Sequence, residues 1–243
     1  VLLSTQRLTD LEAVNVAAQH VLAGAGVSIG ALQSHARAAG LDFAVDWGAR
    51  ASATVGGAVS TNAGGSRVVR FGTMRAQVMG LQMVLADGSV VDESNGLPKE
   101  TAGPRLSNLV VGSEGTLAIV TAARLRLVPW YRNTAAALVG CGSFHDAVEV
   151  LARVRTLSSL DAVEVLMSDA LQVACAHIGS TPPLTGHPLY LLIDCAAHHD
   201  PTDEIRRHPH QQRDLQRARA TKSGGAHREH GRRRGQGVRG RSI

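Results

Sequence analysis

Two glycine-rich stretches hold the residues best suited to bind a ligand through the protein backbone. They are residues 53–65 (ATVGGAVSTNAGG) and 112–117 (GSEGTL). Successive small residues let main-chain N–H groups converge without Cβ atoms in the way, so a pyrophosphate or a flat ring can approach closely. Thr54, Ser60 and Asn62 add hydroxyl and amide groups that could orient such a ligand. Each stretch alone is more often a set of turns than a cofactor site, and their co-occurrence makes the two interpretations about equal.

Several other chemistries lack their motifs. Neither stretch ends in the Gly-Lys-Ser/Thr of a P-loop, so nothing supports nucleoside triphosphate hydrolysis. Residues 24–30 (GAGVSIG) imitate a dinucleotide fingerprint, but the spacing is not GxGxxG. Cys141, Cys175 and Cys195 lie far apart and form no CxxC, which indicates buried free thiols. The histidines and aspartates of residues 194–200 match no ligand spacing, so no metal is predicted.

Length and hydropathy bound the class of protein. The chain has 243 residues, 44% of them hydrophobic, which is enough for one large domain or slightly more. No apolar run reaches the roughly 18 residues of a membrane span, and the start lacks the features of a signal peptide. We therefore expect no transmembrane segment and a cytoplasmic location. The absence of an initiator Met suggests that Val1 begins inside a longer protein.

Basic charge is concentrated at the C-terminus. Residues 206–243 hold 12 Lys and Arg against 2 Asp and Glu, whereas residues 1–205 hold 13 against 18. The tail has almost no aliphatic residues, so it cannot bury enough apolar surface to order itself. It could grip nucleic-acid phosphates. A disordered tail, or an out-of-frame translation of a GC-rich gene, explains it better, so no nucleic-acid partner is favoured.

Cap and turn signals predict the elements that position the glycine stretches. Ser28 is expected to cap a helix over residues 29–39 that stops at a glycine. Residues 81–92 (LQMVLADGSVVD) predict a hairpin with a tight primed turn at Asp87 and Gly88. A strand over residues 109–111 is expected to lead into the second glycine stretch.

A second group of elements is predicted after Pro129, which ends an alternating strand over residues 123–128 with Arg124 and Arg126 on one face. The expected strands are residues 135–141, 162–167 and 189–195. The expected helices begin at a capping box, residues 143–146, and at a cap on Ser168. The buried stripe of the first helix is expected to contain Phe144, Ala147, Val148, Leu151 and Val154.

Four motifs follow one another along the first half of the chain. They are residues 52–65 (SATVGGAVSTNAGG), 70–75 (RFGTMR), 84–88 (VLADG) and 106–117 (LSNLVVGSEGTL). In order and spacing they resemble the FAD-binding domain of the flavin oxidase and dehydrogenase family with the vanillyl-alcohol-oxidase (PCMH-type) fold. The likeness is closest to its D-lactate, glycolate and D-2-hydroxyglutarate dehydrogenase branch, with alkylglycerone-phosphate synthase as a cousin.

The resemblance implies an α+β fold in three parts. Residues 1–129 would form the second subdomain of a PCMH-type FAD-binding domain, without its N-terminal part. Residues 130–205 would begin a ferredoxin-like α+β cap domain over the substrate, and residues 164–171 (EVLMSDAL) fit a common cap pattern. Residues 206–243 would be the basic tail.

FAD is the cofactor that the resemblance implies, with contacts in three groups. Along the flavin and pyrophosphate it places Gly48, Ala49, Arg50, Ala51, Ser52, Ala53, Thr54, Gly56 and Gly57. Near the isoalloxazine and ribityl chain it places Thr61, Asn62, Ala63, Gly64 and Gly65. On the adenosine side it places Gly112, Ser113, Glu114, Gly115, Thr116, Leu117 and Val120.

The sequence also departs from the family pattern. Phe71 stands where a tyrosine is usual, and Ala118 where a glycine is usual. The family's PGGGT phosphate loop would precede Val1, and its His- and Asn-rich catalytic segment would follow residue 205. We therefore expect an incomplete fragment of a flavoenzyme.

The implied reaction is FAD-dependent oxidation of a small-molecule 2-hydroxy acid, such as D-lactate, glycolate or D-2-hydroxyglutarate, by hydride transfer to flavin. Such a site needs a base of near-neutral pKa and a cation for the substrate carboxylate. His20 and His35 are better explained as structural residues, so no catalytic residue is assigned. Arg67, Arg70 and Arg75 could neutralise phosphate or substrate, or be solvated surface residues.

Three alternatives stay open: a non-catalytic fragment of such a flavoenzyme, an enzyme like alkylglycerone-phosphate synthase, and nucleic-acid binding through the tail. The electron acceptor and the oligomeric state are left undetermined.

Overall fold

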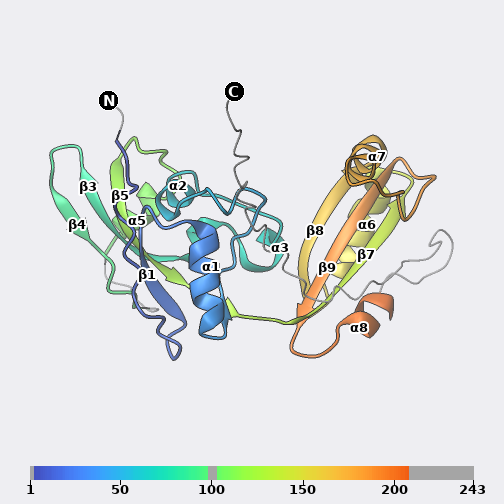
Figure 1. Ribbon diagram of the computed structural model, residues 1–243, viewed down its shortest axis with the longest axis horizontal. Coiled ribbons are helices and arrows are strands. Elements are labelled where there is room, and N and C mark those ends of the chain that lie inside the picture. Colours follow the sequence, from blue (N-terminus) through green and yellow to red (C-terminus); the bar gives the residue numbers. More distant parts are fainter. Residues whose placement is uncertain (1–2, 98–102, 208–243) are drawn as a thin grey trace, which may run out of the picture.

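Two groups of strands lie side by side along the longest axis of the molecule (Figure 1). The structure is a computed structural model that describes residues 3–97 and 103–207. Within these residues the chain forms a mixed α/β structure in which neighbouring strands pair antiparallel.

The first group is a four-stranded sheet in the order β1-β5-β3-β4. Its strands are β1 (His20–Gly24), β3 (Val78–Leu85), β4 (Val90–Asp92) and β5 (Ala118–Arg126). Side chains at the end of β5 alternate between the two faces of the sheet. Ala123 and Leu125 are fully buried, whereas Arg124 is half-buried and Arg126 is exposed. The predicted alternation of this strand is confirmed.

Helices cover one face of this sheet around an aliphatic core. They are α1 (Ile29–Ala38), α2 (Val55–Ser60), α4 (Met74–Gln77) and α5 (Leu106–Val110), whereas α3 (Val68–Phe71) contacts the second group of strands. Ser28 caps α1 as predicted, since its Oγ accepts a hydrogen bond from the Ala31 amide at 3.1 Å. A two-stranded pair of β2 (Leu41–Asp42) and β6 (Val128–Pro129) lies beside α1.

The predicted hairpin forms, but its turn is not of the primed type. The Gly88 amide donates to the Leu85 carbonyl at 3.0 Å, and Gly88 has φ +88° whereas Asp87 has no positive φ. A primed type I turn requires positive φ at both central residues. The connection is instead a type I turn followed by a left-handed glycine, which adds one residue to the loop.

The segment before the second glycine stretch is a helix and not the predicted strand. Residues 109–111 fall in and just after α5, whose first amides, those of Leu106 and Ser107, donate to the Glu93 carboxylate at 3.1 and 2.9 Å. This side-chain cap comes from a residue more than ten positions away, so the short apolar run gave no local sign of it.

The second group is a three-stranded sheet in the order β7-β9-β8. Its elements are β7 (Asn133–Cys141), α6 (Phe144–Val154), β8 (Leu160–Met167), α7 (Ser168–His177), β9 (Leu189–Ala197) and α8 (Thr202–Arg207). Ser143 caps α6 as predicted, through a 3.2 Å bond from the Asp146 amide. Ser168 is the first residue of α7 and makes no cap, so that prediction is wrong.

The predicted buried stripe of α6 is only partly right. Ala147 and Val154 are buried, but Phe144 and Val148 are 59% and 62% exposed. They line an apolar groove of about 220 Å³ with Leu151 and with residues of three other elements, Val69, Val163, Val165 and Leu191. Helical periodicity identifies the apolar face of α6. It cannot show that the sheet covers some of these side chains and leaves others exposed.

The two groups of strands are joined at the contact of α3 with β8. Arg67 and Arg70 of α3 form ion pairs with Asp161 of β8 at 2.9 and 3.2 Å, and all three side chains are at most 16% exposed. Arg70 also donates to the Ala196 carbonyl at 2.9 Å, and its guanidinium lies 4.4 Å from the centre of the Tyr131 ring. Charged groups therefore form the buried part of this junction.

Candidate functional site

The two glycine stretches lie against each other. The Gly112 amide donates to the Val59 carbonyl at 3.0 Å, and the Glu114 amide donates to the Ser60 carbonyl at 2.9 Å. These bonds attach the second stretch to the C-terminal end of α2, which lies inside the first. The sequence predicts two loops that share a ligand. In the structure the two stretches also bind each other directly through their backbones.

The start of α2 is occupied by the protein itself. The amides of Val55 and Gly56 donate to the carbonyls of Val27 and Ala25, both at 2.8 Å. The Gly57 amide donates to the Thr54 hydroxyl at 3.2 Å. An anion normally binds such a helix start through these free amides. The amides of Val55 and Gly56 therefore tie α2 to the loop after β1, the amide of Gly57 binds the Thr54 cap, and none of the three is free for a phosphate.

Some of the glycines are required by the fold alone. A Cβ on Gly65 would lie 1.9 Å from the Asp46 carbonyl oxygen, and a Cβ on Gly56 would lie 2.7 Å from the Ala25 Cβ. Both distances are shorter than any normal contact, so these residues allow two chain segments to pass closely. A ligand is not needed to explain them.

Other glycines leave the backbone open to a ligand. A Cβ on Gly48 or Gly115 would meet nothing within 4 Å, and Gly64 is exposed with a side-chain methyl as its nearest neighbour. Among the hydrogen bonds of the described residues, none uses the main-chain N–H of these three glycines. Glu114 and Gly115 are exposed and have φ of +52° and +77°, which places both residues in a left-handed turn. These positions suit a flat or anionic ligand.

The predicted contact residues differ in exposure. The exposed ones are Gly48, Ala49, Ala51, Ser52, Gly57, Thr61, Gly64, Gly112, Glu114, Gly115, Thr116 and Leu117. The half-buried ones are Arg50, Ala53, Thr54, Asn62, Ala63, Gly65 and Ser113. Gly56 and Val120 are buried, and the Val120 side chain belongs to the hydrophobic core. Only the main chain of Val120 could therefore contact a ligand.

Several polar side chains in the set bond to their own segment. The hydroxyl of Thr61 donates to the Gly57 carbonyl at 3.0 Å, and that of Thr116 donates to the Ser113 carbonyl at 2.7 Å. Arg50 binds the Asp46 carboxylate at 2.8 Å. The recognition surface is thus formed mainly by the backbone.

The arginines near the first stretch are also engaged internally. Arg67 and Arg70 belong to the junction with β8. Arg75 donates to the carbonyls of Val111 and Asn108, which precede the second glycine stretch. The alternative that these arginines are surface residues is wrong for Arg67 and Arg70, which are largely buried, whereas Arg75 is exposed, and the guanidinium groups of all three bind groups of the protein.

Three of the described histidines, His20, His35 and His198, have structural contacts. The His35 ring bonds the Glu12 carbonyl at 2.8 Å, and the His20 ring lies 3.3 Å from Arg124. Burial lowers the pKa of His20, and the Arg124 charge lowers it further. The His198 ring packs edge-on against Tyr131 at 4.8 Å. Within residues 3–97 and 103–207, no three His, Cys, Asp or Glu side chains gather as metal ligands.

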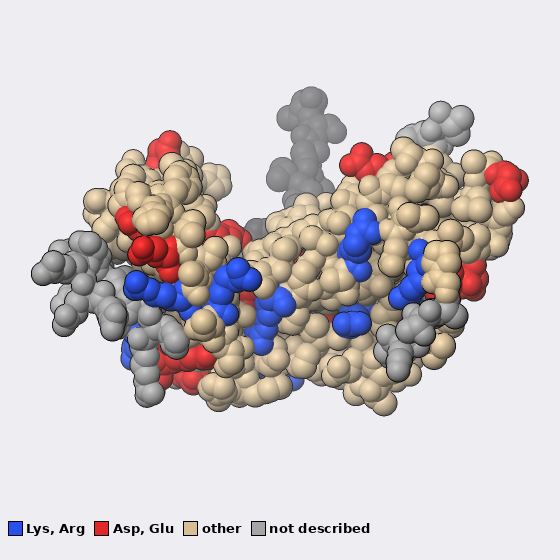
Figure 2. Space-filling model, turned by 180° about the vertical axis from the view of Figure 1, so that it is seen from behind, with Lys and Arg blue, Asp and Glu red and all other residues tan. Residues whose placement is uncertain are grey.

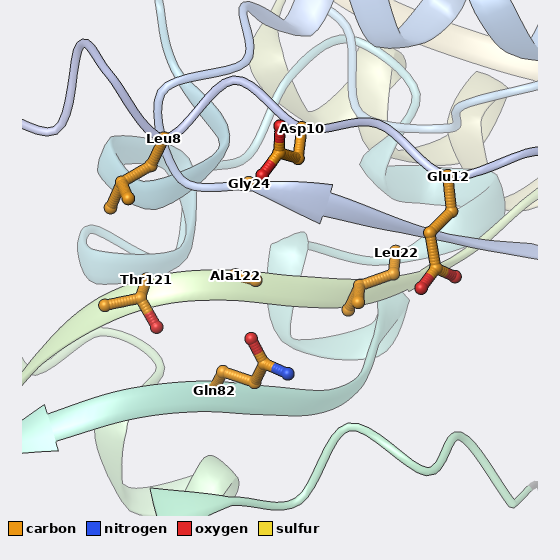
Figure 3. A pocket seen from close by; sticks show the side chains of 8 residues that line it. All are labelled: Leu8, Asp10, Glu12, Leu22, Gly24, Gln82, Thr121 and Ala122. Carbon is orange, nitrogen blue, oxygen red and sulfur yellow. The ribbon is translucent and has the colours of Figure 1, made fainter. Parts of the chain in front are cut away.

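A pocket of about 300 Å³ lies away from the glycine stretches, between the N-terminal segment and the sheet (Figure 3). Its lining residues are Leu8, Asp10, Glu12, Leu22, Gly24, Gln82, Thr121 and Ala122. No local sequence pattern predicts this pocket, because its residues come from four separate segments of the chain. Two carboxylates at its rim would repel a diphosphate, so the pocket does not suit the anionic part of FAD.

Comparison with known proteins identifies relatives of this chain. Residues 1–94 match a protein family described as FAD binding domain. This part of the chain belongs to that family of flavoprotein domains. The relatives that extend beyond it are 2-hydroxy acid dehydrogenases. The chain is 36% identical over 195 residues to a D-2-hydroxyglutarate dehydrogenase of Xanthomonas citri pv. viticola, covering 80% of this chain and 41% of the relative.

Two further dehydrogenases show the same relationship. The mitochondrial D-2-hydroxyglutarate dehydrogenase of Bos taurus is 32% identical over 81% of this chain and 36% of its own length. The D-lactate dehydrogenase of Archaeoglobus fulgidus is 37% identical over 71% of this chain and 39% of its own length. The chain thus spans about two fifths of the relatives it matches.

A solved structure supports the fold independently. Alkyldihydroxyacetonephosphate synthase superposes with a TM-score of 0.65 at 18% identity, over 79% of this chain and 37% of that protein. At this identity the likeness concerns the fold. No helix among the described residues has the length and apolar character to cross a membrane.

Proposed function

We propose that this chain supplies the second glycine-lined half of the FAD site in an FAD-dependent dehydrogenase of 2-hydroxy acids. The observation that carries the proposal is the contact between the two glycine stretches, which creates one continuous backbone surface. Gly48, Gly64 and Gly115 leave that surface open where Cβ atoms would otherwise stand. Identity of 32–37% to D-2-hydroxyglutarate and D-lactate dehydrogenases supports the substrate class.

The fit of FAD to these residues rests on their backbone. Residues 48–54 and 56–57 would lie along the flavin and pyrophosphate. The amides of Gly56 and Gly57 already bind protein acceptors, so in this group the unused Gly48 amide could donate to a phosphate oxygen. Residues 61–65 would approach the isoalloxazine and ribityl chain. Residues 112–117, with the main chain of Val120, would contact the adenosine side.

When bound, FAD supplies the two-electron acceptor for oxidation of a secondary alcohol. The chain's own residues bind and orient the cofactor. The base for the hydroxyl proton and the cation for the substrate carboxylate are assigned to no described residue, because Arg50, Arg67, Arg70 and Arg75 all bind groups of the protein. Catalysis would therefore depend on residues outside residues 3–97 and 103–207.

The second sheet is proposed to begin the cap domain. We retain domain limits of 1–129 for the FAD-binding part and 130–205 for the start of a ferredoxin-like cap. Separate hydrophobic clusters in the two groups of strands support a boundary between β6 and β7. The contact of α3 with β8 would then set how the cap stands over the cofactor.

Titration of the purified protein with FAD tests the proposal. Quenching of flavin fluorescence, or a visible absorption band retained after gel filtration, is the expected result. The control is FMN, which lacks the adenosine moiety and so should bind more weakly if residues 112–117 contact adenosine. Protein that neither retains nor quenches FAD would contradict the cofactor assignment.

The alternatives receive less support. The synthase relationship is one of fold, at half the identity of the dehydrogenases. The basic tail beyond residue 207 lies outside the described residues. On the face that Figure 2 shows, the described Lys and Arg side chains form separate groups among uncharged and acidic ones, with no continuous basic surface. Turnover of D-2-hydroxyglutarate or D-lactate with an artificial electron acceptor separates an active enzyme from a non-catalytic FAD binder.

A further inference from the structure

We propose that Arg75 is the positioning residue that fixes the two glycine stretches relative to each other. The inference deepens the proposed function and rests on it. Arg75 stands on α4, outside both stretches, and none of the predicted FAD contacts includes it. Its role would be to hold the backbone surface in the shape that the cofactor recognises.

The guanidinium of Arg75 binds two main-chain carbonyls just before the second stretch. Its Nη2 donates to the Val111 carbonyl at 2.5 Å, and its Nη1 donates to the Asn108 carbonyl. Both carbonyls lie at the C-terminal end of α5, where the last turn of a helix has no internal donors. A cation at this end also complements the helix dipole. One side chain therefore fixes the end of α5 directly before Gly112.

The backbone of Arg75 holds the end of the first stretch. Its amide donates to the Asn62 Oδ1 at 2.9 Å, and the neighbouring Met74 amide donates to the Ala63 carbonyl at 2.8 Å. Asn62 has φ +48°, a left-handed conformation that asparagine tolerates better than most non-glycine residues, and these two bonds hold it in place. Arg75 thus contacts both stretches, one through its amide and the other through its side chain.

The same contact explains the glycine at position 112. A Cβ at Gly112 would lie 3.1 Å from the Asn62 Cβ and 3.3 Å from the Arg75 Nη2, and the residue has φ +82°. Asn62, Arg75 and Gly112 therefore pack at one point where the stretches meet. The hydrogen bonds from the amides of Gly112 and Glu114 to the end of α2 continue from this point.

Only an arginine can make both side-chain bonds at once. The guanidinium presents several N–H groups in a fixed fork, whereas a lysine ammonium is a compact point charge on a flexible stem. Arg75→Lys should keep the charge at the helix end and lose the fork. Arg75→Ala should lose both.

The test measures FAD affinity and hydrogen exchange in the full chain carrying Arg75→Ala, Arg75→Lys or Arg126→Ala. Arg126 is an exposed arginine at the end of β5 and serves as the control. Loss of charge-assisted bonds predicts FAD binding about 10- to 100-fold weaker for Arg75→Ala, with Arg75→Lys between it and the unaltered chain. Arg126→Ala should change the affinity less than about twofold.

Hydrogen exchange measured without FAD tests the role of Arg75 independently of the proposed FAD binding. The amides of Gly112 and Glu114 should exchange faster in Arg75→Ala, while the thermal unfolding midpoint stays close to that of Arg126→Ala. Unchanged exchange at these amides, or unchanged FAD affinity in a chain that binds FAD, would overturn the role of Arg75. Failure of the unaltered chain to bind FAD, with faster exchange in Arg75→Ala, would overturn the cofactor assignment and leave the positioning role intact.

Discussion

At the scale of single residues, the glycines of the first stretch fall into two kinds. Gly56 and Gly65 have no room for a Cβ, because another segment of the chain passes within contact distance. Gly64 is exposed, with only side-chain methyl groups near the place of a Cβ, and Gly48, just before the stretch, faces open space, so both leave the backbone accessible. Sequence alone gives both kinds the same letter, although substitution should affect stability in one case and ligand binding in the other.

Alanine substitution tests this division. Gly65→Ala places a Cβ 1.9 Å from the Asp46 carbonyl oxygen, so we expect a loss of about 3 kcal/mol in the free energy of unfolding. Gly48→Ala should change stability by less than about 0.5 kcal/mol while weakening FAD binding about tenfold. Urea unfolding and FAD titration measure the two effects, and equal destabilisation of both variants would refute the distinction.

A second residue-scale prediction concerns Asp194 of β9. Burial raises the pKa of this carboxyl, and the charges of Asp161 and Glu164 raise it further. The folded state therefore favours the protonated form. The contribution of Asp194 to stability should be greatest below the ordinary aspartate pKa, fall as pH rises from there through the raised pKa, and stay reduced above it.

Asp194→Asn removes the free-energy cost of holding a buried negative charge near Asp161 and Glu164. The variant should be more stable than the unaltered chain at about pH 7, and the difference should shrink towards about pH 3, where the aspartate is protonated in both states. Chemical denaturation across this range measures it. A variant that loses stability at neutral pH would show that the carboxylate is stabilised by a partner.

At the scale of elements, short helices set the shape of the site, and their ends are fixed by specific bonds. α2 has six residues and α5 has five, too few to be stable by helix propensity alone. Thr54 caps α2, and the Glu93 carboxylate caps α5 from another element. The positions of the glycine stretches therefore depend on a few side-chain contacts.

Removing the cap of α2 should have a measurable cost. Thr54→Val keeps the shape of the side chain and removes the acceptor of the Gly57 amide, so we expect about 1 kcal/mol of destabilisation. Thr54→Ser keeps the acceptor and serves as the matched control. Thermal unfolding of the pair measures the difference, which should vanish if the cap contributes nothing.

At the scale of the whole molecule, the two groups of strands are held by a cluster of charges. Asp161 of β8 binds both Arg67 and Arg70, and Arg67 also binds Asp42 at 3.2 Å. Because these groups are largely buried, removing one member leaves the others without compensation. The cluster would therefore keep the second sheet in one orientation relative to the glycine stretches.

Asp161→Ala should loosen this junction. We expect a loss of about 3 kcal/mol in unfolding free energy and faster proteolytic cutting of the connection at residues 130–132. Glu149→Ala removes a carboxylate from an exposed ion pair and should cost less than about 0.5 kcal/mol. Slow cutting in Asp161→Ala, equal to that of the control, would mean that other contacts hold the two groups.

The sequence by itself determined the features that depend on neighbouring residues. The cap on Ser28, the Asp87–Gly88 hairpin, the alternation of β5 and the motifs of the FAD binding domain could all be read from local pattern. Tertiary structure alone decided which glycines lie against another chain segment, that residues 109–110 are helical, and that Phe144 is exposed. It also decided the partners of Arg70 and Arg75. The physical reason is that these outcomes depend on contacts between residues far apart in the chain, such as Gly65 with Asp46 and Arg75 with Val111, which no local periodicity encodes.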